Sequence, residues 1–316
     1  MNEFPTISIC IPAYKNIKFL KRLFDSIAIQ DFRDFEVIVT DDSPGKDVEL
    51  LCNTYEASFS LIYYKNYPAL GSPANWNKGI SYAKGEWIKI MHDDDWFVSS
   101  RSLGIFASAT KISDIRFIFS GFNNVSEDNK FEVNTITAYE KYLLRKNPVN
   151  LLKRNFIGHP STTLIRKDIV GKYDEKLKWV VDLEYYIRVL GTSGNFFLID
   201  GSLINIGISK EQITSLVFRK PDIEIPENIY LLKRIGTKAL KNIFAYDYFW
   251  RFIRNLKVRD IGILRTYYNI GDEPDLLLVM VKQQKLLPFF LLNIGAFSKV
   301  AMLFSYLRNR IKKRMQ

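Results

Sequence analysis

Three consecutive aspartates, Asp93, Asp94 and Asp95, are the residues of this chain whose type and spacing are best suited to chemistry. Neighbouring carboxylates repel one another, and a buried carboxylate without a partner is costly, so a cation is expected to neutralise them. Divalent cations such as Mg²⁺ and Mn²⁺ take oxygen ligands, often one or two carboxylates together with phosphate oxygens. The alternative is a solvated acidic turn that caps the following helix, because aspartate is a good N-cap.

A second acidic pair, Asp41 and Asp42, also follows an apolar run and precedes Ser43 and Pro44. Taken alone, this pair is better explained by an Asx-type turn than by a functional site. Both acidic groups come directly after predicted strands, however, and the carboxyl ends of the strands are where open α/β sheets bind ligands. The two groups are therefore predicted to converge on one crevice.

Four short apolar runs predict buried strands at residues 6–12, 35–40, 61–64 and 87–91. Between the first two runs, apolar residues recur at helical spacing from Ile17 to Ile27. A strand, a helix and a strand within about 35 residues form a βαβ unit with a right-handed crossover, so its strands are predicted to be parallel. Further predicted elements are helices at 75–83 and 182–190 and less regular strands at 116–120, 131–137 and 162–166.

The composition is that of a folded protein, since 47% of the 316 residues are hydrophobic and 25% are charged. It excludes disordered, collagen-like and disulfide-scaffold proteins. Cys10 and Cys52 belong to no CxxC pair or Cys/His cluster, so neither a zinc site nor a redox site is predicted. Residues 71–73 lack the spacing of a P-loop or a GxGxxG motif, which argues against an ATPase or a dehydrogenase. No secretory signal is evident, so a reducing cytosol is the expected compartment.

The net charge of +11 lies entirely in the last third of the chain, because residues 1–215 contain 26 basic and 26 acidic side chains. Pro221 and Pro226 mark a linker-like stretch at the same place. We therefore expect an α/β domain at residues 1–218 and a basic helical region at residues 219–316.

The basic region contains one long apolar segment, residues 286–307, whose single charge is Lys299 and which five basic residues follow. Its length allows a membrane span, but the positive-inside rule would then move the rest of the chain out of the cytoplasm. Lys299 also adds about 2.5–3.5 kcal/mol to the insertion free energy. We favour a helix in the membrane interface, with residues 274–316 meeting anionic headgroups, over a helical-subdomain core or a span. Nucleic acid is not an expected partner, because no binding motif accompanies the charge.

Several segments match the motifs of a known family in the same order along the chain. They are residues 9–16, 35–43, 75–80, 83–88, 92–95 and 173–177, followed by Val181, Asp182 and Arg188. With these segments the sequence resembles the inverting glycosyltransferases of family 2. The resemblance covers about residues 5–215. It implies an α/β fold of the GT-A type, Rossmann-like with a mostly parallel central sheet, here followed by the basic C-terminal helical region.

The resemblance also implies roles for single residues. Pro12, Ala13 and Tyr14 would line the nucleotide base, and Asp41 would hydrogen-bond the base, most often uracil in this family. Asp93 and Asp94 would face the ribose and the metal-bound diphosphate, with Asp94 and Asp95 holding Mn²⁺ or Mg²⁺. Asp182 would be the general base, although without the resemblance a helix N-cap is the better explanation for it.

Two departures from the family pattern affect these assignments. His92 stands where many members have the first Asp of the DxD motif, so two registers stay open. Either Asp93-x-Asp95 is the literal motif, or Asp94-Asp95 is its second half. Val181 replaces an acidic residue that often precedes the base, which leaves Asp182 in place and Glu184 in reserve.

Other side chains have weaker assignments. His159 could contact the diphosphate or the acceptor, although a loop histidine is more often structural. Trp76 and Trp96 flank the predicted site and could stack on a sugar, although aromatic residues more often serve the core. Gln212, Thr214 and Ser215 resemble a loop that lies late in the family's sequences, near the donor phosphates.

The chemistry fits these parts. A metal can neutralise the leaving diphosphate, and a carboxylate can take the proton of the acceptor hydroxyl. The prediction is a metal-dependent inverting glycosyltransferase that uses a nucleotide sugar, with UDP as the expected nucleotide. The expected acceptor is a glycan, lipid-linked, in cell-surface polysaccharide synthesis of the O-antigen or capsule type, at the cytoplasmic face of the membrane. The alternatives are a non-catalytic nucleotide-sugar-binding relative and a basic membrane or nucleic-acid adaptor.

Overall fold

The computed structural model describes residues 4–128, 130–208, 217–268 and 275–311, which form two compact units. The first unit comprises residues 1–145, 156–175 and 189–212, and the second comprises residues 146–155, 176–188 and 213–316. The second unit therefore includes two short segments from the earlier part of the chain as well as the C-terminal region. The boundary between residues 218 and 219 stays a prediction.

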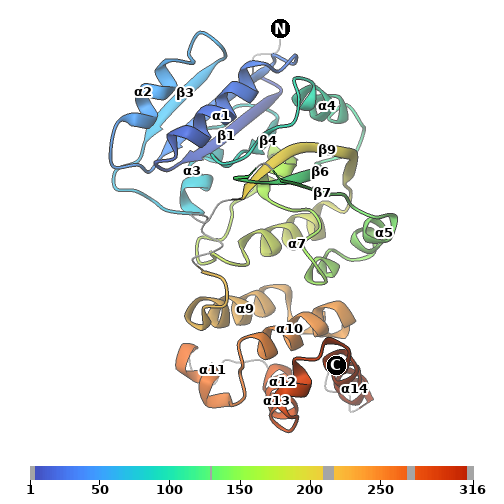
Figure 1. The fold of residues 1–316 in the computed structure, drawn as a ribbon. Coiled ribbons are helices and arrows are strands. Elements are labelled where there is room, and N and C mark those ends of the chain that lie inside the picture. The colour runs from blue at the N-terminus through green and yellow to red at the C-terminus, as the bar shows by residue number, and fades with distance from the viewer. Residues whose placement is uncertain (1–3, 129, 209–216, 269–274, 312–316) are drawn as a thin grey trace. The chain divides into compact units, whose positions relative to one another are not determined.

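The N-terminal half of the sheet is parallel, as the sequence predicts (Figure 1). Its strands lie in the order β3-β2-β1-β4, with bounds β1 Ile7–Ala13, β2 Phe35–Asp41, β3 Leu61–Lys65 and β4 Trp87–Ile90. In the register of β1 and β2, Ala13 lies beside Asp41. Side chains that follow these strands therefore gather at one edge of the sheet.

The other half of the sheet is mixed, and β8 (Thr163–Arg166) joins it to β4 by an antiparallel pairing. Beyond it lie β6 (Phe117–Ser126) and β9 (Phe197–Ile208), which pair in parallel. Two short strands, β5 (Trp96–Phe97) and β7 (Phe131–Asn134), pair antiparallel with β9 and β6 respectively. The predicted α/β fold with a mostly parallel central sheet is confirmed.

Helix α1 (Ile17–Ala28) connects β1 to β2 and buries the apolar face that its sequence predicts. Leu20, Leu23, Phe24 and Ile27 lie in the same core as the alternating side chains of β1. Burial of each such side chain contributes about 1.5–3 kcal/mol. The remaining helices of this unit are α2 Asp47–Asn53, α3 Ala74–Tyr82, α4 Ser102–Ala109, α5 Ala138–Lys146, η2 Pro160–Thr162 and α6 Lys167–Val170.

The second unit is helical. Its described elements are η1 Pro148–Leu152, the first half of α7 (Val181–Ser193), α9 Pro221–Ile235, η3 Thr237–Lys241, α10 Ile243–Asn255, α11 Ile261–Tyr267, α12 Asp275–Lys285, α13 Phe289–Leu292 and α14 Gly295–Ile311. The core includes Tyr246, Phe249 and Trp250 of α10, all at most 1% exposed. The predicted basic C-terminal helical region is thus present.

The expectation of a linker at Pro221 and Pro226 is wrong, because both residues belong to helix α9. Pro221 occupies the first turn, where a missing N–H leaves no helical hydrogen bond unmade. Pro226 lies inside the helix, where it removes the donor for the carbonyl four residues earlier. The apolar side chains that follow it, including Ile229 and Leu232, are fully buried and outweigh that loss.

Helix α14 carries its polar and apolar faces in an unusual arrangement. Its buried face is largely polar, since Tyr246 shares hydrogen bonds of 2.5 Å and 2.8 Å with Ser305 and Asn309, and the indole N–H of Trp250 donates to Ser298. Its exposed face is apolar at helical spacing, with Val300, Leu303, Phe304, Leu307 and Ile311. Lys299, Arg308 and Arg310 are exposed beside this apolar stripe.

The predicted apolar segment at residues 286–307 does not form one continuous helix. It is divided between α13 and α14, with Asn293 and Ile294 between them. Among the described helices, none combines the length and the hydropathy that crossing a bilayer requires.

Candidate functional site

The predicted nucleotide-binding residues meet at the carboxyl edge of the parallel strands. The backbone N–H of Tyr14, just after β1, donates to the carboxylate of Asp93, just after β4, over 3.2 Å. The N–H of Asp42, after β2, donates to the carbonyl of Ala13 over 3.0 Å. Pro12 and Ala13 form the end of β1, and Tyr14 remains 52% exposed. The two acidic groups thus flank β1 on one edge of the sheet.

The carboxylate of Asp41 is buried and already has three hydrogen-bond donors. The N–H of Ser43 donates to Oδ1 over 2.7 Å, and the hydroxyl of Tyr63 and the ammonium of Lys65 donate to Oδ2 over 2.8 Å each. Burial, followed by the hydrogen bond to Asp41, raises the pKa of Tyr63. Asp41 therefore holds the turn after β2, while its predicted contact with a nucleotide base stays a prediction.

Asparagines that the sequence treats only as motif residues hold loops of the first unit together. The side chain of Asn75 donates to the carbonyl of Thr40 over 2.9 Å. The side chain of Asn77 donates to the carbonyl of Tyr173 and accepts from the N–H of the same residue, over 2.9 Å and 2.8 Å. Two polar side chains on one turn of α3 thus anchor two distant segments, a role that spacing alone does not reveal.

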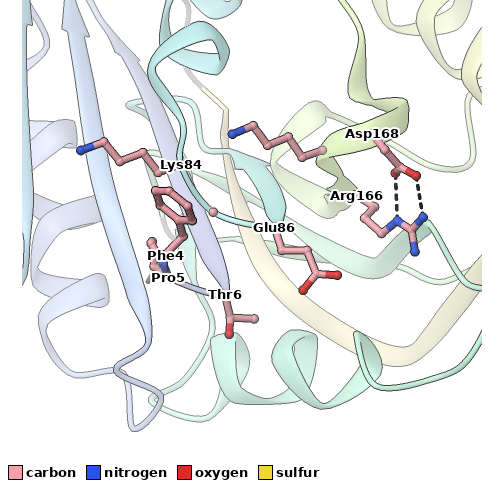
Figure 2. Close-up of a pocket in the computed structure, with 9 residues that line it drawn as sticks. Phe4, Pro5, Thr6, Lys84, Glu86, Arg166 and Asp168 are labelled. Atoms are coloured by element: carbon pink, nitrogen blue, oxygen red, sulfur yellow. Dashed lines mark hydrogen bonds and ion pairs between the residues drawn. The ribbon is translucent and has the colours of Figure 1, made fainter. Parts of the chain in front are cut away.

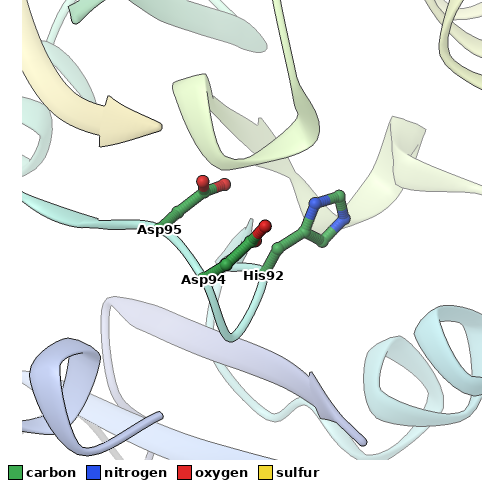
Figure 3. Close-up of side chains that lie close together, drawn as sticks. All are labelled: His92, Asp94 and Asp95. Carbon is green, nitrogen blue, oxygen red and sulfur yellow. The ribbon is translucent and has the colours of Figure 1, made fainter. Parts of the chain in front are cut away.

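A potential metal site lies in the loop between β4 and β5. His92, Asp94 and Asp95 each place one ligand atom within 4.8 Å of the other two, and Figure 3 shows the three side chains projecting from one loop toward the same side. Asp95 is only 1% exposed, and neither of its carboxylate oxygens has a hydrogen-bond partner among the described residues. Carboxylate oxygens and an imidazole nitrogen are donors that divalent cations accept, so this group fits such an ion.

The electrostatics of this loop favour an additional positive charge. Burial raises the pKa of Asp93 to about 7, with a further contribution from Asp94 and opposition from the N–H of Tyr14. Burial also raises the pKa of Asp95, and again the charge of Asp94 adds to the effect. Burial lowers the pKa of His92 to about 4. The fold therefore gathers three carboxylates in one loop, where a bound cation would further stabilise their charged forms.

Lys89 of β4 is the buried cation nearest in sequence to this loop. It is fully buried, and its ammonium donates to the carbonyl of Ser161 over 2.6 Å. It also lies 4.1 Å from the ring centroid of Phe106, a cation–π contact. Burial lowers its pKa to about 7, against the attraction of Asp95. Ser161 also accepts the N–H of His92 at its hydroxyl over 3.0 Å, so one residue contacts both β4 and the loop that follows it.

Helix α1 and strands β5 and β9 hold the acidic loop in place. The guanidinium of Arg22 donates to the carbonyl of Asp94 over 2.7 Å and lies 3.5 Å from the ring centroid of Trp96. Gly207 of β9 approaches so closely that a Cβ there would lie 2.5 Å from the same carbonyl. Trp96 thus stacks on an arginine of its own chain. Sequence reasoning missed Arg22, because it is one of several basic residues on the polar face of a helix.

The other two predicted aromatic and histidine candidates also lie near this loop. The ring of Trp76 is 4.8 Å from that of His92 and 5.1 Å from that of Tyr173, centroid to centroid. His159 is close enough to influence the charge of His92, and burial lowers its pKa against the attraction of Asp94. Gln212, Thr214 and Ser215 lie outside the described residues.

Asp182 belongs to the second unit, in the first turn of α7. Its Oδ1 is buried and has no hydrogen-bond partner among the described residues. Burial raises its pKa to about 7, so the carboxyl can exchange a proton near neutral pH. Glu184 is instead held by Arg188 and Arg234, at 2.9 Å and 3.3 Å, which leaves it less suited to the reserve role.

Glu227 of α9 organises the segment that leads into α7. Its carboxylate accepts the N–H groups of Lys178 and Trp179 over 2.8 Å each and that of Val180 over 3.2 Å. These are the residues directly before Val181, where the helix begins. The position of Asp182 on its helix therefore depends on a carboxylate far along the chain.

A separate pocket opens at the other end of the parallel strands (Figure 2). It is lined by residues just before β1 and β4 and by Arg166, Lys167 and Asp168. Arg166 and Asp168 form a two-bond ion pair, at 2.9 Å and 2.5 Å. None of the predicted site residues lines this pocket.

A model of the family described as "Glycosyl transferase family 2" matches residues 8–174, just over half of the chain. A relative in Methanocaldococcus jannaschii, the "Uncharacterized glycosyltransferase MJ1057", is 28% identical over 78% of this chain and 84% of its own length. A relative in Campylobacter jejuni, "GalNAc(5)-diNAcBac-PP-undecaprenol beta-1,3-glucosyltransferase", is 32% identical over 30% of this chain and 31% of its own length.

Among solved structures, the crystal structure of S. aureus TarS 1-349 in complex with UDP-GlcNAc has the same fold, with a TM-score of 0.59. Its sequence is 16% identical, and the match covers 89% of this chain and 80% of that chain. At this identity the likeness concerns the fold.

Proposed function

Because this chain belongs to glycosyl transferase family 2 and is a nucleotide-sugar transferase, we propose that it is a metal-dependent inverting enzyme acting on a lipid-linked glycan with a UDP-sugar as donor. The observation that carries the metal-dependent part is the acidic loop after β4. It places Asp94 and the buried, unpartnered carboxylate of Asp95 beside each other at the edge where Tyr14 contacts Asp93. The complex of S. aureus TarS with UDP-GlcNAc supports the choice of nucleotide.

Donor binding is assigned to the ends of β1, β2 and β4. Pro12, Ala13 and Tyr14 face the base, and Asp93 faces the ribose. Asp94 and Asp95 hold the divalent cation, Mn²⁺ or Mg²⁺, which when bound supplies positive charge to the leaving diphosphate. Asp41 contributes to base binding through the turn that it holds with Ser43, Tyr63 and Lys65.

Proton removal from the acceptor is assigned to Asp182. A hydroxyl is a weak nucleophile and needs a base within hydrogen-bond reach. A carboxyl with a pKa near 7 and a buried oxygen without a partner is prepared to accept that proton. Attack on the face of the sugar opposite the leaving diphosphate inverts the anomeric centre, as in inverting glycosidases.

The acceptor and the location rest on the second unit and on the relatives. The name of the Campylobacter relative specifies an undecaprenol-linked acceptor, which supports a lipid-linked glycan as the acceptor. We assign this glycan to cell-surface polysaccharide synthesis. The apolar stripe of α14, flanked by Lys299, Arg308 and Arg310, suits the interface of an anionic membrane. We assign to residues 274–316 the role of holding the enzyme at the cytoplasmic face as a peripheral protein.

A calorimetric titration with UDP-sugars, with and without Mn²⁺, tests the donor half. We expect binding that depends on the metal and that Asp94→Asn weakens. Asp114→Asn is the control, because Asp114 lies in an exposed turn outside the acidic loop, and it should leave binding unchanged. Release of UDP in the presence of acceptor tests catalysis. Binding without release would identify a non-catalytic relative, and binding to none of the nucleotide sugars would contradict the proposal.

Sedimentation with vesicles tests the membrane half. Phe304→Glu should reduce binding to vesicles that contain phosphatidylglycerol, because this side chain is 70% exposed on the apolar stripe. Phe131→Glu is the matched control, since Phe131 is 63% exposed on strand β7. Equal loss in both variants, or no loss in Phe304→Glu, would contradict the assignment of α14 to the membrane. Anion binding that needs none of the aspartates and accepts nucleic acid equally well would favour the adaptor.

A further inference from the structure

We propose that His92 is a third protein ligand of the divalent cation and that it makes the site prefer Mn²⁺ over Mg²⁺. The inference rests on the proposed metal dependence and goes beyond it, because the sequence assigns the ion only to Asp94 and Asp95. By the resemblance described above, His92 stands where many members of the family have an aspartate. A nitrogen donor there changes which ion the site selects.

The geometry brings the imidazole into the acidic group. The ligand atoms of His92, Asp94 and Asp95 lie within 4.8 Å of one another, and all three side chains project from one loop toward the same side (Figure 3). Ligands on opposite sides of a Mg²⁺ ion are about 4.2 Å apart, because each bond is about 2.1 Å long. Adjacent ligands of such an ion are only about 3.0 Å apart, so the three side chains must draw closer together to close around it.

A second observation points to an ion at this place. Asp95 is 1% exposed, and both of its carboxylate oxygens lack a hydrogen-bond partner among the described residues. The Ser161 hydroxyl and the Gly207 N–H favour the charged form of Asp95, which lowers its pKa, but neither forms a hydrogen bond of normal geometry with its carboxylate. A buried carboxylate in this state is stabilised by a cation bound directly to it.

The loop is also built to keep the imidazole where it is. The backbone N–H of His92 donates to the hydroxyl of Ser161 over 3.0 Å, and its ring packs against Trp76 at 4.8 Å. The carbonyl of Asp94 is fixed by Arg22 at 2.7 Å. Ligand side chains that their surroundings hold in this way pay little entropy when the metal binds.

The type of donor decides the metal preference. Mg²⁺ prefers oxygen ligands and water, whereas imidazole suits the first-row transition metals better. A site with one nitrogen and two carboxylates therefore favours Mn²⁺, and replacement of the nitrogen by a carboxylate moves the preference toward Mg²⁺. We expect His92→Asp to reduce the ratio of Mn²⁺ to Mg²⁺ affinity by about tenfold.

Pulsed EPR of the Mn²⁺ complex with UDP tests the ligand directly. A coordinated imidazole gives a hyperfine coupling from its nitrogen, and labelling of the histidines with ¹⁵N replaces that signal. The chain contains two histidines, so His159→Asn is a matched control next to the same loop. The coupling should disappear in His92→Asp and in His92→Gln and persist in His159→Asn.

The outcomes separate the two proposals. Mn²⁺ that binds with no histidine coupling, and with a metal preference unchanged in His92→Asp, contradicts the role of His92 while metal dependence stands. Absence of Mn²⁺ binding, with UDP present or absent, contradicts the metal dependence itself. A coupling that persists in the His92 variants and disappears in His159→Asn assigns the ligand to His159 and overturns the inference. Circular dichroism of each variant establishes that it is folded, and His92→Gln provides a second folded test.

Discussion

Replacement of Asp182 by asparagine is expected to abolish sugar transfer and, at the same time, to stabilise the protein above pH 7. The side chain is partly accessible to solvent, but its Oδ1 is buried and has no partner in the part of the chain that the structure describes, and burial raises its pKa from 3.8 to about 7. A raised pKa means that the folded state disfavours the ionised form. The charged Asp182 therefore costs stability at the pH where a general base must be ionised.

The magnitude follows from the shift in pKa. The pKa of Asp182 is about three units higher in the folded state than in the unfolded state, which corresponds to about 4 kcal/mol of lost stability at pH 8. Solvent access and the unpaired amide of asparagine reduce the gain, so we expect about 2 kcal/mol. For a chain of this size that raises the unfolding temperature by about 4 °C.

The sign of the effect depends on pH. Well below the unfolded pKa of 3.8 the carboxyl is neutral in both states, so Asp182→Asn gains nothing there. The gain grows as the pH rises through the unfolded pKa and becomes constant above about pH 7. At pH 5 about a third of the gain is expected.

Thermal unfolding of both proteins at pH 5 and pH 8, with UDP release as the activity assay, measures the effect. Asp25→Asn serves as a control of opposite sign, because hydrogen bonds from Lys21 and Tyr55 lower the pKa of Asp25. Transfer should fall at least about 100-fold in Asp182→Asn with donor binding retained. A variant that is less stable than the natural protein at pH 8, or a gain that does not vary with pH, refutes the unpaired buried carboxylate. Near-normal transfer refutes the base.

Three further outcomes are expected. Glu227→Ala should lower the free energy of unfolding by about 3 kcal/mol in urea, because three N–H groups lose a buried acceptor, and Glu227→Gln should lie between it and the natural protein. Gly207→Ala should weaken Mn²⁺ binding about tenfold in calorimetry, since its Cβ displaces the Asp94 carbonyl; Gly191→Ala, where no atom lies within 4 Å, should leave the affinity unchanged. Chelation of divalent ions should reduce both UDP affinity and transfer, and added Mn²⁺ should restore them, so undiminished transfer in excess chelator would contradict metal dependence.

Local sequence patterns were sufficient for the parallel half of the sheet. The apolar runs predict β1 to β4 to within two residues at each end, and the spacing of Leu20, Leu23 and Ile27 predicts the buried face of α1. These strands are buried on both faces, so their sequences are continuous apolar runs that stand out from the chain. The mixed half of the sheet was harder to predict from the sequence. Strand β9 was not predicted, and its pairing with β6 joins segments far apart in the sequence.

The same division holds for the candidate site. The types and order of Asp41, Asp93, Asp94 and Asp95 already indicate metal and nucleotide chemistry. Tyr63 and Lys65 donate hydrogen bonds to the Asp41 carboxylate from the neighbouring strand, and the sequence alone does not show this contact. The same is true of the contact between Arg22 and the Asp94 carbonyl, which joins residues 72 positions apart.

The sequence by itself determined the α/β class, the family, the acidic loop after β4 and the confinement of the positive charge to the last third of the chain. These features are written in residue types and short spacings, which local physical rules can interpret. Tertiary structure alone decided that Tyr63 and Lys65 donate to Asp41, that Asp95 is buried with no hydrogen-bond partner among the described residues, and that α14 turns its polar side chains inward. Burial and pairing are properties of atoms that meet across the fold, so no single segment contains them.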